Sequence, residues 1–262
     1  MKTQKATPLI SVLLSFVFLL SACDMSIAQA TSTPAPTDTP KPTATITLTA
    51  TNTPRPSPTP RPTKTPNLAA TQKYEEFNAE AQKYFDLGYL TTKDGSTKEE
   101  DNFTYDWAQL GWYKWFPLNK NASDFFISAH FRWLSAYKNA SDSGCGFAFA
   151  IQPNNEHYAV FLDRRKIIFL DADNRYSYSH YVGKTRGTGR VKFDNPAEAE
   201  FTLIVKGAYA YILVDGELYG EYTLSESRIL KGDIGLTVLS GTNKDYGTRC
   251  EMTNIHVWIP ND

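Results

Sequence analysis

The chain of 262 residues lacks the patterns that common catalytic and metal centres require. Its four histidines are far apart in sequence and show no paired His-x-x-x-His spacing, so no zinc motif is indicated. No segment presents the Glu-x-Asp-x-Glu type of strand that some glycoside hydrolases use. We therefore predict no catalytic residues. The sequence leaves enzymatic activity open without favouring it.

The chain also lacks an excess of either charge. Lysine and arginine total 27 against 28 acidic residues, so there is no basic excess to attract nucleic acid, which is not an expected partner. No apolar run is long enough for a membrane span, because the run from Leu9 to Leu20 falls well short of the roughly 20 residues that a helix needs. Following Lys2 and Lys5, that run instead predicts a signal peptide.

The end of the apolar run carries a resemblance. Leu20-Ser-Ala-Cys23 resembles the bacterial lipobox, in which the cysteine receives a lipid before cleavage. The resemblance implies that residues 1–22 are a lipoprotein signal peptide and that Cys23 holds the protein on the extracellular or periplasmic side of a cell membrane. The alternative is an ordinary secretory signal cut near residues 28–30, which would discard Cys23.

A stalk follows the anchor. Residues 31–66 include 13 threonines and 10 prolines, which cannot form a core and favour extended polyproline II conformations. We predict that residues 23–66 are a lipidated cysteine followed by a disordered linker that lifts a domain off the membrane. Two cysteines remain, Cys145 and Cys250. They either form a disulfide that closes a loop of about 105 residues or stay as buried thiols.

Residues 67–262 contain 33 aromatic side chains, a density that suits broad packed sheets. Residues 67–90 are predicted to form an amphipathic helix that packs on the domain, with Asn67 as its N-cap and Gly88 as its C-cap. Its apolar stripe comprises Leu68, Tyr74, Phe77, Ala81, Tyr84 and Phe85. Residues 94–101 are predicted to be a charged loop.

Residues 91–262 are predicted to be all-β, as an antiparallel two-sheet jelly-roll sandwich. The turns at Lys206-Gly207 and Asp215-Gly216 and the turn over residues 171–175 separate short β-rich segments. The predicted strands are 112–118, 124–133, 145–152, 157–162, 166–171, 176–181, 199–206, 209–215, 218–224, 233–239 and 248–259.

The tail of the chain carries the second resemblance. Phe201-Thr-Leu-Ile-Val-Lys-Gly, Ala210-Tyr-Ile-Leu-Val-Asp-Gly-Glu, Gly232-Asp-Ile-Gly-Leu-Thr-Val and Cys250-Glu-Met-Thr-Asn-Ile-His-Val-Trp258 follow one another. Their order is similar to the closing strands of concanavalin A-like lectin/glucanase domains, notably the laminin-G-like and keto-disaccharide-hydrolase-like branches. The resemblance implies the fold and leaves the activity open, because sandwich folds host many functions.

Candidate site residues fall into three groups. Trp112 and Trp115 are candidates for stacking on sugar rings, although strand alternation and core packing compete for them. Arg175, Tyr176, Tyr178 and His180 form a second candidate ligand-binding group. Asp171, Asp173 and Asn174 offer oxygen ligands for calcium, the one cofactor considered, although a plain hairpin turn explains them as well.

These features favour a lipid-anchored, non-catalytic binding domain whose partner, besides the membrane, is a polysaccharide. The alternative is a structural or protein-interaction module that binds another protein of the cell envelope. A glycan-processing hydrolase is the third hypothesis, and it would require two carboxylates about 5 to 10 Å apart on the floor of a concave sheet.

Overall fold

Short strands rich in aromatic and β-branched side chains dominate the domain. The structure is a computed structural model that describes residues 68–138, 140–173, 179–183, 186–187 and 195–261. The predicted signal peptide, Cys23 and the predicted stalk lie outside these ranges. Within them the elements are α1 (Leu68–Asp86), β1 (Gly95–Glu99), β2 (Phe103–Trp107), β3 (Trp112–Ala122), β4 (Phe125–Ser135), β5 (Gly144–Ile151), β6 (His157–Asp163), β7 (Lys166–Ala172), β8 (His180–Tyr181), β9 (Arg186–Gly187), β10 (Ala197–Lys206), β11 (Tyr209–Val214), β12 (Glu217–Thr223), β13 (Gly232–Ser240) and β14 (Thr248–Pro260).

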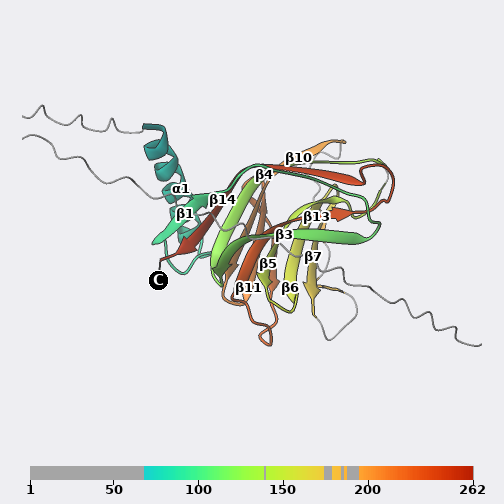
Figure 1. Ribbon diagram of the computed structural model, residues 1–262. Helices are drawn as coiled ribbons and strands as arrows, with labels where there is room; N and C mark the ends of the chain where they lie inside the picture. The colour runs from blue at the N-terminus through green and yellow to red at the C-terminus, as the bar shows by residue number, and fades with distance from the viewer. Residues whose placement is uncertain (1–67, 139, 174–178, 184–185, 188–194, 262) are drawn as a thin grey trace, which may run out of the picture. The chain divides into compact units, whose positions relative to one another are not determined.

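The strands form two antiparallel sheets (Figure 1). Sheet A has the order β1-β14-β4-β10-β11-β12, and β2 also pairs with β14. Sheet B has the order β3-β13-β5-β6-β7-β8, and β9 pairs with β7. Strands distant in sequence lie side by side, as β14 does with β4. This arrangement confirms the predicted all-β sandwich preceded by one helix.

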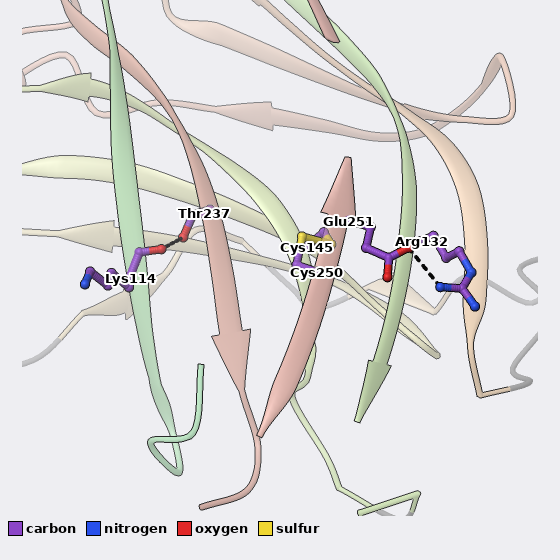
Figure 2. The surroundings of a disulfide bond; sticks show 6 residues. All are labelled: Lys114, Arg132, Cys145, Thr237, Cys250 and Glu251. Carbon is purple, nitrogen blue, oxygen red and sulfur yellow. Dashed lines mark hydrogen bonds and ion pairs between the residues drawn. A yellow bond between two sulfur atoms is a disulfide. The ribbon is translucent and has the colours of Figure 1, made fainter. Parts of the chain in front are cut away.

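The core lies between the two sheets because alternate side chains of each strand point inward. On β4 these are Phe125, Ile127, Ala129, Phe131 and Trp133, and all five are fully buried. Cys145 of β5 and Cys250 of β14 are also fully buried and form a disulfide, with their Cα atoms 5.5 Å apart. The disulfide therefore joins sheet B to sheet A, as Figure 2 shows.

Helix α1 covers part of the outer face of sheet A. Ala81 and Tyr84 are buried there against a second apolar cluster formed by Leu90, Phe126, Ile204, Leu213 and Trp258. The helix ends as predicted, because Gly88 has a positive φ of 77° and its backbone N–H donates to the carbonyl of Phe85. No helix in the described ranges is both long enough and apolar enough to cross a membrane.

The predicted stripe of α1 is only partly used. Leu68 and Tyr74 are 71% and 66% exposed and Phe85 is also exposed, whereas Ala81 and Tyr84 are buried against the sheet. Lys73, in the first half of α1, pairs with Glu99 of β1, an edge strand of sheet A. Asn67, the predicted N-cap, lies outside the described residues.

The predicted loop over residues 94–101 was wrong, because Gly95–Glu99 forms β1. β1 and β2 lie in succession along one side of the 13-residue β14, pairing with residues 256–260 and 248–252. Charged side chains are tolerated on β1 because an edge strand has one solvated side. Local composition did not indicate this strand, because the strand that it pairs with is more than 150 residues away in sequence.

The predicted turns are present where the structure describes them. Asp215 and Gly216 both have positive φ, 52° and 77°, which suits a tight hairpin between β11 and β12. Gly207 has a φ of 53° between β10 and β11. Of the predicted strand 176–181 the structure describes residues 179–181, and His180–Tyr181 pairs with β7.

Candidate functional site

A row of aromatic side chains lines the side of the sandwich where β2 of sheet A and β3 of sheet B lie. We call it the edge strip and define it as Phe103, Tyr105, Trp107, Trp112, Lys114 and Phe116. The rings of Phe103 and Tyr105 stack with centroids 6.3 Å apart, and Tyr105 contacts Phe116 at 4.5 Å. Except for the exposed Trp112, each strip residue is partly buried, and Phe103, Tyr105, Trp107 and Phe116 pack on one side against the core while keeping part of their surface exposed.

The strip is held rigidly. The indole Nε1 of Trp107 donates to the backbone carbonyl of Trp112 at 3.1 Å. The ammonium of Lys114 donates to Tyr105 Oη at 3.0 Å and lies 5.6 Å from the ring of Trp107. Thr237 Oγ1 of the neighbouring β13 donates to the Lys114 carbonyl at 2.8 Å, as Figure 2 shows. Aromatic side chains fixed in this way lose little conformational entropy when a ligand binds.

The strip ends at an exposed tryptophan. Trp112 is 62% exposed and Leu110, in the turn before it, is 60% exposed. The β13–β14 and β4–β5 loops lie at the same end of the sandwich, because Gly111 N–H donates to the Ser240 carbonyl and Ala136 N–H to the Gly247 carbonyl. Tyr137 of the second of these loops is 43% exposed. Large apolar side chains are thus concentrated where loops meet, a common position for binding residues.

A second aromatic group lies on the outer face of sheet B. Tyr113 and Trp115 of β3 point there, and the ring of Trp115 lies 4.4 Å from that of His157. His157 donates from Nδ1 to the Asn155 carbonyl at 2.7 Å and accepts from Tyr113 Oη at Nε2, 2.8 Å away. Burial lowers the pKa of His157 and raises the pKa of Tyr113. The His157 imidazole and the Tyr113 hydroxyl are therefore neutral at pH 7, and the two side chains pack together on the outer face of sheet B.

The two tryptophans chosen from sequence do not share a surface. Trp112 and Trp115 are three residues apart on one strand, so alternation places them on opposite faces. Trp112 belongs to the edge strip and Trp115 to the outer face of sheet B. Arg175, Tyr176 and Tyr178 lie outside the described residues. His180 is partly buried on β8, and in the strand register its backbone lies opposite that of Asp171 on β7.

The candidate calcium ligands have a different partner. The guanidinium of Arg228 lies 3.3 Å from Asp171 Oδ1, 3.6 Å from Asp173 Oδ2 and 3.4 Å from Glu156 Oε2. The Arg228 side chain is only 6% exposed. The positive charge that these carboxylates require is thus supplied by the chain itself. Asn174 is not described, and the described residues contain no group of three metal-ligating side chains.

A cavity of about 630 Å³ lies between α1 and the outer face of sheet A. Its carboxylates are already engaged. Glu80 accepts from Tyr84 Oη at 2.9 Å and pairs with His256 Nε2 at 2.7 Å. Glu200 pairs with His130, and Asp215 accepts from the backbone N–H of Glu200. These contacts attach the helix and a turn to the sheet.

Sequence reasoning missed four residues of the edge strip: Phe103, Tyr105, Lys114 and Phe116. A signal was present, because Phe103-Thr-Tyr-Asp-Trp107 alternates aromatic and polar residues as a half-buried strand does. The approach of β2 to β3 was not predictable, because it depends on the pairing of β2 with β14 and of β3 with β13.

No protein-family model matches the chain, and no curated protein matches it. Several solved structures align with part of the chain. The carbohydrate-binding module CBM66 from Bacillus subtilis matches at 12% identity and a TM-score of 0.44, over 63% of this chain and 97% of the module. A B. subtilis protein of unknown function with a galectin-like fold matches at 11% identity and 0.46, over 64% and 89%.

A fructosyltransferase from A. japonicus matches at 12% identity and a TM-score of 0.39, over 64% of this chain. The chain spans only 27% of that enzyme. The strand order and pairing of the chain itself define an antiparallel β-sandwich.

Proposed function

We propose that the mature protein is a non-catalytic carbohydrate-binding domain that a lipid on Cys23 and a Thr/Pro-rich stalk display outside a bacterial membrane. The observation that carries the proposal is the edge strip with the exposed Trp112 at its end. Sugar rings present apolar C–H faces, which pack on aromatic carbons, while their hydroxyls bond to polar groups at the rim. A preformed row of rings along a strand supports the binding of an extended chain of sugars.

A second candidate function is a protein-interaction module of the cell envelope. The same strip favours it, because partly exposed rings next to Leu110 and Trp112 form an apolar patch of the kind found at protein interfaces. The two functions differ in ligand, so glycan binding tests the first directly.

The test measures binding of the full-length lipoprotein in detergent to a broad glycan array. We expect Trp112→Ala to lose binding, on the order of tenfold or more for the loss of one stacking anchor. Trp115→Ala is the matched control on the other face and should retain binding. Loss with Trp115→Ala alone would move the site to the outer face of sheet B. Silence across the array from folded protein would overturn the proposal in favour of the interaction module.

The anchor has its own test. Wild-type protein expressed in a bacterial host should carry radiolabelled palmitate and partition into a detergent phase, whereas Cys23→Ser should do neither. A Cys23→Ser protein that is exported, cleaved near residues 28–30 and indistinguishable from the wild type would establish the ordinary secretory signal instead.

A further inference from the structure

Lys114 brings a positive charge into the edge strip without a carboxylate of its own among the described residues. Its ammonium contacts Tyr105 Oη at 3.0 Å and lies 5.1, 5.6 and 5.5 Å from the ring centroids of Tyr105, Trp107 and Phe116. The neighbouring Asp106 is not available, because Arg249 binds both of its carboxylate oxygens at 2.7 Å.

An ammonium in this setting still has donors to offer. Lysine has three N–H donors, and one of them is used by Tyr105. Ring faces attract a cation weakly, by about 0.5 to 1 kcal/mol at exposed sites, and accept no strong hydrogen bond. Lys114 is partly exposed to solvent. A carboxylate forms a strong, charge-assisted hydrogen bond with such a donor.

A second ammonium lies at the end of the strip. Lys244 of the β13–β14 loop sits 4.6 Å from the ring centroid of Tyr137, and it too has no ion pair with a described carboxylate. The backbone bond from Gly111 to Ser240 keeps the turn before Trp112 beside β13, the strand that leads into this loop. The exposed rings at this end are therefore accompanied by positive charge.

We propose that the edge strip binds an acidic polysaccharide whose sugar rings stack on its aromatic residues while a sugar carboxylate pairs with Lys114. The inference rests on the proposed function and specifies its ligand class. The rings follow one another along β2 and β3, which fits an extended polymer better than the flat surface of a lipid bilayer.

The test uses the full-length lipoprotein in detergent and measures affinity for polygalacturonate, alginate, hyaluronan and a set of neutral glucans. Methyl-esterified polygalacturonate is the matched probe, because esterification removes the charge and keeps the sugar. We expect at least one acidic polymer to bind, esterification to weaken any polygalacturonate binding, and Lys114→Met to lower the affinity on the order of tenfold. Raising NaCl from about 0.05 to about 0.5 M should weaken this binding.

The controls separate charge from folding and from general electrostatics. Lys114→Arg keeps the charge and should bind within a few-fold of the wild type. Lys231→Met removes an exposed lysine next to the opposite end of β13 and should leave affinity unchanged. Thermal unfolding of each variant identifies any that fails to fold, in which case Lys114→Gln replaces Lys114→Met.

Each outcome has a defined meaning. Trp112-dependent binding to neutral glucans alone, insensitive to Lys114→Met, would overturn the acidic ligand and keep the proposed function. No binding to any polysaccharide would overturn both. Binding to anionic phosphatidylglycerol vesicles with the same dependence on Lys114, and to no polysaccharide, would identify a lipid surface and overturn the inference.

Discussion

At the scale of single residues, the surroundings of two histidines, His256 and His157, shift their pKa values in opposite directions. His256 faces two acceptors, Glu80 Oε2 at 2.7 Å and the Asn254 carbonyl at 3.1 Å, so both of its ring nitrogens must carry a proton to bond. Burial alone would lower the pKa of His256, but the hydrogen bond and charge of Glu80 outweigh burial and raise it. His157 faces one acceptor and one donor and stays neutral.

The two histidines predict opposite pH dependences. A raised folded-state pKa means that the stability from His256 is present below the unfolded value of about 6.5 and is lost as pH rises through the folded pKa. A lowered folded-state pKa means that His157 costs stability as pH falls below about 6.5. NMR titration should place the midpoint of His256 above that of His157. The reverse order would contradict these assignments.

Arg228 gives a second prediction at this scale. Arg228→Met leaves Asp171, Asp173 and Glu156 without their shared guanidinium, and Asp173 is only 3% exposed. Breaking a buried ion pair typically costs about 3 to 5 kcal/mol. Urea unfolding should show a loss of this size. Arg132→Met is the matched control, because Arg132 is 39% exposed with its carboxylates Glu198 and Glu251 and should cost below about 1 kcal/mol.

At the scale of elements, the short edge strand β1 depends on a glycine. A Cβ at Gly95 would overlap the indole of Trp258, which stacks on Phe126 with an interplanar angle of 8°. Gly95→Ala should therefore displace β1 or Trp258 and cost about 1 to 3 kcal/mol. Hydrogen exchange should show amides of residues 96–99 losing protection first. Unchanged protection and stability would show that the site relaxes freely.

The same elements show how far sequence reasoning reaches. Strands such as β10, β11 and β13 were predictable because their β-branched runs end at turns with Gly or Asp-Gly. The two-sheet sandwich was predictable from the number of these short strands. β1 was missed because its charged residues suit a loop and its partner, β14, is distant in sequence. Only part of the edge strip was predictable. Trp112 was identified from the sequence, but the contact between Lys114 and Tyr105 arises only from the tertiary structure.

At the scale of the molecule, the two sheets are held together by packing and by one covalent link. Cys145 and Cys250 are separated by 105 residues, so their bond removes a large amount of conformational entropy from the unfolded chain. Chain-entropy arguments put the stabilisation at roughly 4 to 5 kcal/mol for a loop of this length. The proposed display of this domain outside a cell would suit such a bond, because disulfides persist in oxidising compartments.

Alanine substitutions can isolate this contribution, because both cysteines are fully buried and alanine adds no polar group. Either Cys145→Ala or Cys250→Ala alone breaks the same bond, so each should cost most of the predicted 4 to 5 kcal/mol. The double variant should then cost little more than either single one, which is the non-additivity expected of interacting partners. Single losses that are small and sum in the double variant, measured by denaturant unfolding without reductant, would indicate two independent buried thiols instead.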